Sequence, residues 1–319
     1  MTETLQKSSG SMKAYWTALR AYSFPASIVP VIYGAVLAVI LNPGLKFNIL
    51  FFAFTLIGCM SVHIVANLIN DIFDYKKGVD KKDNEIGVPH GGSHVLSEGL
   101  LTIKQMWIET IIFLFIAVAC GVYLYFQIGN WVLYLSLAGL FMSVFYTASP
   151  VQFKYKALGD IGVFLGFGTG MTLGSYIVQT GQFSWIPVIV SIPFGLLIVA
   201  ILHANNIRDM KFDNMFGIKT LPIIIGEKPS KYFYNFTILG AYASIVFFVI
   251  FGLLPYFALL NFITLPIAIK LIKMLNHVPT EPMAKFEWGT KHNVMTAQFN
   301  MQFGLALIAG LIIAKLFFM

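Results

Sequence analysis

The chain has 319 residues, of which 58% are apolar and only 11% are Asp, Glu, Lys or Arg. An ordinary soluble domain carries roughly 25% charged residues, so the composition excludes a soluble enzyme and predicts an integral membrane protein. The net charge of +7 comes from basic residues that are dispersed over many segments and interleaved with acids. This pattern does not indicate a nucleic-acid partner, and nothing in the sequence indicates an obligate protein partner.

Apolar segments long enough to cross a bilayer follow one another along the chain. A hydrocarbon core of roughly 30 Å requires about 20 apolar residues per helix. Nine segments satisfy this requirement: 22–41, 47–69, 107–126, 131–149, 161–178, 185–206, 232–251, 254–272 and 297–318. Trp107, Trp131 and Trp185 each begin one of them, which is typical of indole rings at the membrane interface. We predict an all-α polytopic membrane protein with nine transmembrane helices, forming one domain over residues 1–319.

The charges of the connecting segments indicate an orientation. The N-terminal tail, residues 1–21, is polar and lacks the apolar core of a cleaved signal peptide. Of the 21 Lys and Arg residues, all except Lys46 and Lys315 fall on the side of the membrane that holds this tail. The positive-inside rule assigns that side to the cytoplasm. We therefore expect a cytoplasmic N-terminus and, in a bacterial host, insertion in the cytoplasmic membrane.

Two of the predicted spans end in clusters of carboxylates and amides. If the second span continues as a helix to residue 74, its polar residues share an arc of about 100°. They are His63, Asn67, Asn70, Asp71 and Asp74. At the end of the sixth span, Asn206, Asp209 and Asp213 share an arc of about 60°, with Asn205 beside them. Segments 66–71 and 204–209 share an Ala-Asn-x-x-x-Asp pattern, which chance explains as readily as an internal duplication.

The carboxylate clusters predict a metal and diphosphate site on the cytoplasmic side. Carboxylates gathered on inward helix faces are costly unless they are paired, protonated or bound to a cation; the alternative is a set of solvated interfacial charges. Carboxylate and Asn oxygens suit Mg²⁺ or Mn²⁺, and Mg²⁺ usually takes one or two carboxylates together with substrate phosphates. Arg208, Lys219, Lys154 and Lys156 lie on the same side and can hold the remaining phosphate charge.

An isoprenoid diphosphate fits this arrangement, because its head lies at the interface and its tail in the lipid. Ionisation of its allylic C–O bond requires stabilisation of the leaving diphosphate by a metal and by cations. A secondary transporter is an alternative, but it would place ionisable residues near the bilayer midplane, where these spans hold almost none. The Asp-Gly-x-x-Ala-Arg signature of the CDP-alcohol phosphotransferases is absent.

Both aspartate clusters resemble motifs of one family. NLINDIFDYKKGVD (67–80) and NNIRDMKFDNMFGIKTL (205–221) resemble the two Asp-rich motifs of the UbiA superfamily of intramembrane prenyltransferases. Segments 19–38, 146–168 and 296–310 resemble the branch that acts on 1,4-dihydroxy-2-naphthoate. The resemblance implies nine helices around a central cavity, cytoplasmic cap segments at about 71–106 and 207–231, and a lateral opening for the polyprenyl tail. Asp160 and the cap stretch 87–101 depart from the pattern of that branch, which leaves the acceptor open.

The resemblance also implies an activity and a site. The activity is Mg²⁺-dependent transfer of a polyprenyl group from polyprenyl diphosphate to an aromatic acceptor, first of all 1,4-dihydroxy-2-naphthoate, with decarboxylation to demethylmenaquinone. The alternative acceptors are 4-hydroxybenzoate, homogentisate, haem and a glycerol phosphate lipid. The implied catalytic residues are Asp71, Asp74, Asp209, Asp213, Lys154 and Tyr146. The implied ligands of two Mg²⁺ ions, or of Mn²⁺, are Asn67, Asp71, Asp74, Asp209 and Asp213. The residues expected to bind substrate are Asn67, Asn70, Asn205, Asn206, Arg208, Lys219, Arg20 and Asp160.

Overall fold

The computed structural model describes residues 10–79 and 92–318, and no β-sheet forms within these ranges. Its helices are α1 (Met12–Ala18), α2 (Pro25–Leu41), α3 (Ile49–Lys77), α4 (Ile103–Ile128), α5 (Asn130–Phe145), α6 (Gly159–Val163), α7 (Met171–Thr180), α8 (Trp185–Val190), α9 (Ile192–Met215), α10 (Leu221–Ile225), α11 (Glu227–Ile250), α12 (Leu265–Leu275) and α13 (Pro282–Phe318). Three short 3₁₀ segments, η1 (Ala21–Ser23), η2 (Phe153–Tyr155) and η4 (Tyr256–Thr264), and one π-helical segment, η3 (Phe164–Gly170), connect or extend them.

The helices confirm a polytopic membrane protein. Within the described ranges, seven helices or continuous helical runs are long and apolar enough to cross a bilayer. The segment formed by α1 and η1 meets α2 at an angle of 53°, and if the two together form one span, the number is eight. The apolar helix α5 has 16 residues, fewer than a full crossing normally needs. Every one of the nine predicted segments coincides with helical structure. Nine crossings and a cytoplasmic N-terminus remain predictions.

Local sequence explains why the first aspartate motif is helical. The Asn48 side chain accepts a hydrogen bond from the backbone N–H of Phe51 at 3.1 Å and begins α3. The helix ends at Gly78, which has the left-handed φ of 80° that glycine adopts readily. Lys76 and Lys77 lie in the last turn, where they interact favourably with the helix dipole. α3 therefore continues beyond Asp74, as expected, and keeps the polar residues on one helical face.

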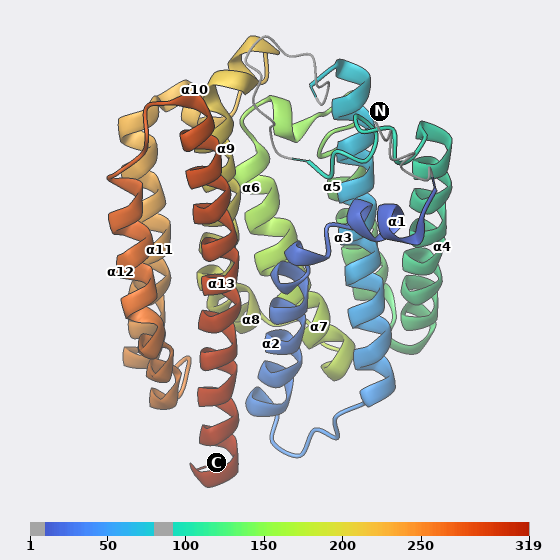
Figure 1. The fold of residues 1–319 in the computed structure, drawn as a ribbon. Helices are drawn as coiled ribbons and strands as arrows, with labels where there is room; N and C mark the ends of the chain where they lie inside the picture. The colour runs from blue at the N-terminus through green and yellow to red at the C-terminus, as the bar shows by residue number, and fades with distance from the viewer. Residues whose placement is uncertain (1–9, 80–91, 319) are drawn as a thin grey trace.

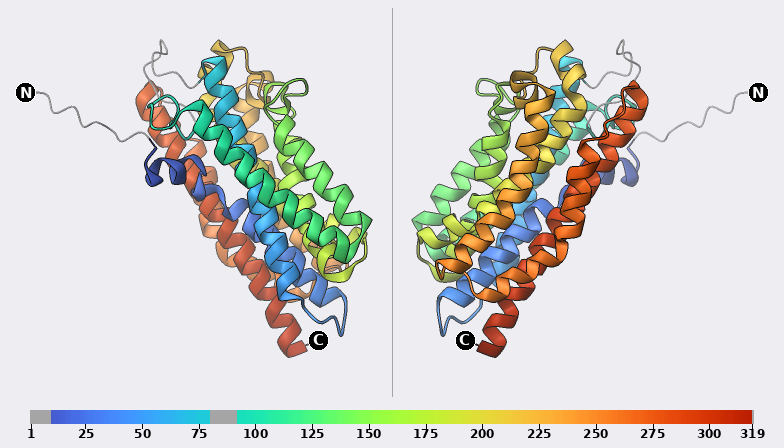
Figure 2. Two further views of the ribbon diagram at one scale, coloured as in Figure 1. Left: turned by 90° about the vertical axis from the view of Figure 1, so that its right-hand side faces the viewer. Right: turned by 90° about the vertical axis from the view of Figure 1, so that its left-hand side faces the viewer.

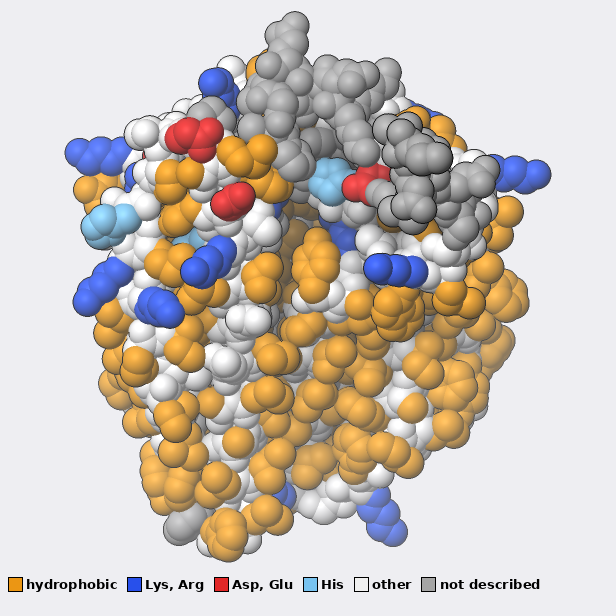
Figure 3. Space-filling view, viewed as in Figure 1, with side chains coloured by type: hydrophobic (Ala, Val, Ile, Leu, Met, Phe, Trp, Pro, Cys, Tyr) orange, Lys and Arg blue, Asp and Glu red, His pale blue; other side chains and the backbone are white. Residues whose placement is uncertain are grey.

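The long helices run along a common axis, and α1 lies across it (Figures 1 and 2). Charged side chains gather at the end of the bundle where the N-terminal segment lies, whereas hydrophobic side chains cover its flank (Figure 3). Lys46, in the connection between α2 and α3, and Lys315, in the last turn of α13, lie at the opposite end (Figure 1). The main hydrophobic core joins α2, α7, α9, α11 and α13.

Close helix packing at the centre depends on a glycine in α2. A Cβ atom at Gly34 would lie 2.1 Å from the backbone oxygen of Thr172 in α7, a contact that backbone atoms cannot relieve. We expect Gly34→Leu to destabilise the bundle by at least about 2 kcal/mol, measured as a lower thermal unfolding temperature in detergent. Gly139→Ala is the matched control, because a Cβ at Gly139 meets no atom within 4 Å. Equal unfolding temperatures for the two variants would contradict this account of the packing.

Candidate active site

A cavity of about 1110 Å³ is lined by residues of both aspartate motifs; Asn67 and Asn70 of the first motif line it, whereas Asp71 and Asp74 are not among its lining residues. Its wall is formed by η1, α2, α3, α4, α5, α6, η3, α7, α9 and α13. One end is polar, and the residues that line it include Arg20, Asn67, Asn70, Tyr146, Lys154, Asn205, Asn206, Arg208, Asp209 and Asp213. The remainder of the wall is mostly apolar. The structure thus brings the ends of α3 and α9, more than 100 residues apart in sequence, to one amphipathic space.

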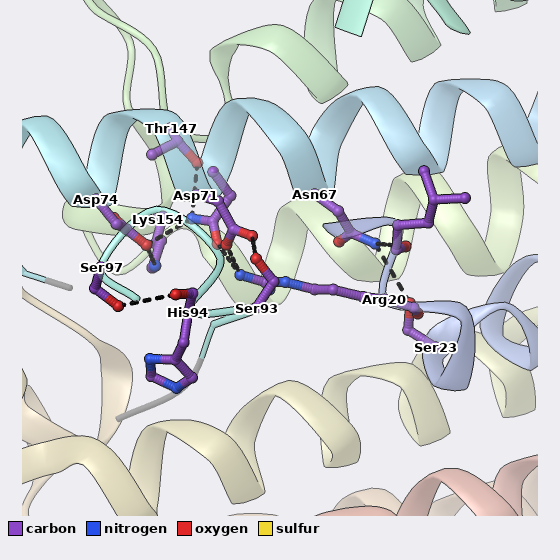
Figure 4. A network of polar contacts seen from close by, with 12 residues as sticks. Arg20, Ser23, Asn67, Asp71, Asp74, Ser93, His94, Ser97, Thr147 and Lys154 are labelled. Carbon is purple, nitrogen blue, oxygen red and sulfur yellow. Dashed lines mark hydrogen bonds and ion pairs between the residues drawn. The ribbon is translucent and has the colours of Figure 1, made fainter. Parts of the chain in front are cut away.

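Asp71 on α3 is held by two side chains from other segments. Arg20 forms an ion pair with its carboxylate, and Ser93 donates a hydrogen bond to the other carboxylate oxygen (Figure 4). Arg20 also donates to Oδ1 of Asn70 at 3.3 Å. The backbone of Arg20 has a φ of 54°, a left-handed conformation that costs a non-glycine residue free energy. This strained turn lets the N-terminal segment direct a guanidinium group at α3.

Asp74, one turn further along α3, is buried and has three hydrogen-bond donors. Lys154 Nζ lies 2.5 Å from Oδ2, the Tyr155 hydroxyl donates to Oδ1 at 2.5 Å, and Asn70 Nδ2 donates to Oδ2 at 3.0 Å. Burial alone would lower the pKa of the Lys154 ammonium group. The charge of Asp74, its hydrogen bond and the nearby charge of Asp213 outweigh burial and hold that pKa above its ordinary value. Lys154 is therefore a permanent cation that both aspartate motifs share.

On α9, Arg208 and Asp209 form a bidentate pair. The guanidinium Nε and NH2 atoms donate to the two carboxylate oxygens at 2.7 and 2.6 Å. The guanidinium also lies 5.5 Å from the centre of the Phe286 ring on α13. A Cβ at Gly289 would lie only 2.5 Å from the Arg208 side chain, so this glycine lets α13 pack against it. The pair is held in one orientation beside the cavity.

Asp213 differs from the other three aspartates. Its side chain lines the cavity and is only 7% exposed. It makes no hydrogen bond or ion pair with any residue in the described part of the chain. A buried carboxylate without a partner carries a large desolvation cost, which a bound cation relieves.

The donor set of the polar end fits Mg²⁺. Among residues 10–79 and 92–318, no three His, Cys, Asp or Glu side chains are already grouped to hold a metal ion. Mg²⁺ does not require such a group, since it is commonly held by one or two carboxylates and completed by substrate phosphates and water. The unpartnered carboxylate of Asp213, with amide oxygens of Asn67 and Asn205 in the same cavity wall, supplies ligands of this kind.

Two predicted substrate-binding residues lie away from the cavity wall. Lys219 is exposed; its backbone N–H donates to the Tyr155 carbonyl at 3.3 Å, and its side chain does not line the cavity. Asp160, at the start of α6, is buried, with Oδ1 3.6 Å from Nδ1 of His203.

Much of the expected first cap, residues 80–91, lies outside the described residues, and so do residues 1–9 of the tail. The flanks of that cap, residues 71–77 and 103–106, belong to α3 and α4.

Several polar contacts of the site were not predicted. Ser93 and Tyr155 contact the aspartates directly. His63 lies between two serine hydroxyls, with Nε2 3.2 Å from Ser23 Oγ and Nδ1 2.7 Å from Ser27 Oγ. The Ser23 hydroxyl donates to the Arg20 carbonyl at 2.8 Å, so it accepts from His63, which fixes the proton on Nε2. No local pattern distinguishes these serines from others in the chain.

The fold and cavity define a class, namely a polytopic helical membrane protein with a polar, metal-compatible site at one end of an apolar cavity. Residues 27–313 match the family model of the UbiA prenyltransferase family. The chain therefore belongs to the UbiA prenyltransferase family.

Relatives from bacteria and vertebrates align along nearly the whole chain. The chain is 29% identical over 303 residues to 1,4-dihydroxy-2-naphthoate octaprenyltransferase of Bacillus subtilis (strain 168), covering 94% of this chain and 92% of the relative. It is 32% identical over 322 residues to UbiA prenyltransferase domain-containing protein 1 of Rattus norvegicus, covering 94% and 84%.

Solved structures share the fold at low sequence identity. A UbiA homolog from Aeropyrum pernix K1, without ligand, has a TM-score of 0.68 at 16% identity, covering 93% of this chain and 98% of the other. A UbiA homolog from Archaeoglobus fulgidus bound to GPP and Mg²⁺ has a TM-score of 0.59 at 15% identity, covering 93% and 99%.

Proposed function

We propose that this protein transfers a polyprenyl group from a polyprenyl diphosphate to 1,4-dihydroxy-2-naphthoate in menaquinone biosynthesis. The observation that carries the proposal is the polarity of the cavity: basic and acidic side chains line one end, and apolar side chains line the rest. A diphosphate joined to an isoprenoid tail has the same distribution of charge. Membership of the family and the B. subtilis relative support prenyl transfer over a transport function, and support this acceptor first.

The basic residues are placed to bind the diphosphate. Arg20, Lys154 and Arg208 each form an ion pair with an aspartate, and all three line the cavity. Each also has donors beyond those used in its pair, so each can bind a phosphate oxygen when the head group enters. The paired aspartates hold the cations in place before substrate binds. The site is thus assembled in advance, which lowers the cost of ordering it during the reaction.

The acidic residues would hold the metal. Asp213 and Asn67, joined by Asp71, Asp74 and Asp209, would bind Mg²⁺ together with the diphosphate. Bound Mg²⁺ supplies positive charge that stabilises the leaving diphosphate. The Asp71, Asp74 and Asp209 carboxylates would exchange part of their contact with basic side chains for this role, whereas Asp213 has no hydrogen bond or ion pair to release among the described residues.

The cavity then protects the reactive carbon. Breaking the allylic C–O bond releases the diphosphate and leaves a cation that water would capture. Tyr146 and Phe167 line the cavity near the polar end, and aromatic faces stabilise such a cation. A new C–C bond forms at the ring carbon that bears the carboxylate. Loss of CO₂ from that carbon restores the aromatic ring and gives demethylmenaquinone in its reduced form.

The test offers purified protein one polyprenyl diphosphate and each acceptor in turn: 1,4-dihydroxy-2-naphthoate, 4-hydroxybenzoate, homogentisate, haem and a glycerol phosphate lipid. We expect a prenylated, decarboxylated naphthalene product that disappears with EDTA and returns when Mg²⁺ is added in excess. Exclusive prenylation of another acceptor would overturn the naphthoate assignment. Product formation that resists the chelator would overturn the metal assignment.

A further inference from the structure

The turn that carries Arg20 is fixed at its backbone by polar side chains. The Ser23 hydroxyl donates a hydrogen bond to the Arg20 carbonyl at 2.8 Å. From α3, Asn67 Nδ2 donates to the Leu19 carbonyl at 3.3 Å and to Ser23 Oγ at 3.4 Å. Figure 4 shows the Arg20 side chain leaving this turn and running along α3 to Asp71. The direction of the guanidinium group therefore depends on how α3 holds the turn.

His63 lies one turn before Asn67 on the same face of α3 and completes this contact. Its Nε2 atom is 3.2 Å from Ser23 Oγ, and its Nδ1 atom is 2.7 Å from Ser27 Oγ. Because the Ser23 proton is used on the Arg20 carbonyl, the imidazole donates to Ser23 through Nε2–H. In the neutral ring, Nδ1 then accepts from Ser27. The imidazole thus joins α3 to two successive segments, the turn at Ser23 and the first turn of α2.

Packing keeps the imidazole ring against Ser23. His63 is only 5% exposed, and Phe167 of η3 meets it at nearly a right angle, with the ring centres 4.7 Å apart. The left-handed backbone of Arg20 costs free energy and persists only where surrounding contacts hold it. His63 contributes one of these contacts from a distance, since positions 63 and 71 are separated by about 12 Å along α3. Its influence on Arg20 is therefore independent of the pair that Arg20 forms with Asp71.

We propose that His63 is a positioning residue for diphosphate binding: through the Ser23 hydroxyl it holds the strained turn of Arg20 and so directs the guanidinium group at the polar end of the cavity. His63 itself lines the cavity, but serine hydroxyls occupy both of its nitrogen atoms, so it does not bind the diphosphate. The inference rests on the proposed function, in which Arg20 binds a phosphate oxygen. It adds a residue that acts on the diphosphate through the backbone of the N-terminal segment.

The experiment compares His63→Phe and His63→Gln with the wild type. Phe keeps a ring of similar shape and removes both hydrogen bonds, whereas Gln keeps an amide N–H that can donate to Ser23. The measurements are kcat, the KM for the polyprenyl diphosphate and the inhibition constant of inorganic pyrophosphate at fixed Mg²⁺. We expect His63→Phe to raise the inhibition constant and the KM about tenfold, the effect of losing about one hydrogen bond, with a smaller change in kcat. His63→Gln should recover most of this loss.

Control variants separate positioning from folding. His292→Phe makes the same change at an imidazole that is 1% exposed, has Nε2 3.2 Å from the Leu271 carbonyl and lies outside the cavity wall. It should lower the unfolding temperature in detergent and leave the inhibition constant of pyrophosphate unchanged. Ser23→Ala removes the hydroxyl that joins the imidazole to the turn, and it should raise the inhibition constant about as much as His63→Phe. It gives an independent reading if the substitutions at position 63 prevent folding.

Double variants test whether His63 acts through Ser23 and Arg20. When His63→Phe is added to Ser23→Ala or to Arg20→Ala, the inhibition constant should rise no further, because the link or the group that it positions is already absent. Additive losses, an unchanged inhibition constant in folded His63→Phe and Ser23→Ala, or an equal change in His292→Phe overturn the positioning role while the proposed function stands. A wild type that transfers no prenyl group and is not inhibited by pyrophosphate overturns the proposed function itself.

Discussion

Asp213→Asn should lower the rate of prenyl transfer about 100- to 1000-fold and leave the protein at least as stable as the wild type. Asp213 is the buried aspartate of the cavity whose side chain makes no hydrogen bond or ion pair among the described residues, so its charge is offset only in part, by the nearby Lys154 and Arg208, until a cation binds. Asn keeps the size of the side chain and removes the charge. The loss of a group that stabilises the leaving diphosphate accounts for the slower reaction. The loss of a buried charge that no ion pair neutralises accounts for the retained stability.

The measurements are kcat with saturating donor and acceptor, the Mg²⁺ concentration that gives half-maximal rate, and the unfolding temperature in detergent. The Mg²⁺ requirement should rise in the variant, since a metal ligand is weakened. Glu227→Gln is the matched control: it makes the same chemical change at an acid whose side chain is 44% exposed and pairs with Lys231 and Lys285 outside the cavity. Wild-type activity in Asp213→Asn would remove this residue from the metal site.

Helical periodicity was sufficient to predict the aspartate clusters but not their partners. Once α3 is helical, the spacing of its polar residues places them on a common face; they are Asn67, Asn70, Asp71 and Asp74. The capping residues extend α3 beyond Asp74, so that all four lie in the helix. The pairs Arg20 with Asp71 and Lys154 with Asp74 join residues 51 and 80 positions apart. The charges of the segments place these residues on one side of the membrane, but only tertiary packing decides which base faces which acid.

Changes of helix type within a span were also beyond the sequence pattern. Segments 161–178 and 254–272 were each predicted as one helix, because apolar composition alone defines a span. Each forms one continuous helical run, Gly159–Thr180 and Tyr256–Leu275, but the first contains a π-helical stretch at Phe164–Gly170 and the second a 3₁₀ stretch at Tyr256–Thr264. In the first, a Cβ at Gly168 would lie 2.5 Å from the Cα of Gly195, so the π-helical stretch accompanies a close approach to α9. Such approaches depend on the neighbouring helix, which hydropathy does not report.

The polar end combines two kinds of carboxylate. Asp71, Asp74 and Asp209 are each neutralised by a basic side chain, so they contribute to folding before any ligand binds. Asp213 has no ion pair among the described residues and only the more distant charges of Lys154 and Arg208 nearby, so binding of a ligand cation lowers the cost of its burial. The stability of the empty protein and its affinity for substrate therefore depend on different members of one cluster. Substitutions that separate the two properties are the most direct way to assign each residue.

Lys154→Met should destabilise the protein by about 3–5 kcal/mol, because it leaves the Asp74 carboxylate buried without its cation. The Asp74 side chain is 1% exposed, and the remaining donors, Tyr155 and Asn70, are neutral. The measurement is the unfolding temperature in detergent, which should fall by many degrees. Lys156→Met is the matched control two residues along, where an exposed ammonium group donates to the Pro150 carbonyl at 3.2 Å and to no other group among the described residues.

The double variant Lys154→Met with Asp74→Asn separates folding from catalysis. With both charges removed, most of the lost stability should return, because no unpaired charge remains buried; the coupling between the two substitutions should exceed about 2 kcal/mol. Prenyl transfer should stay at least about 100-fold below wild type, since the restored fold lacks both a phosphate-binding cation and a carboxylate of the metal site. A double variant as unstable as Lys154→Met would show that the lysine stabilises the fold through packing rather than through Asp74. A double variant with wild-type activity would exclude both residues from the chemistry.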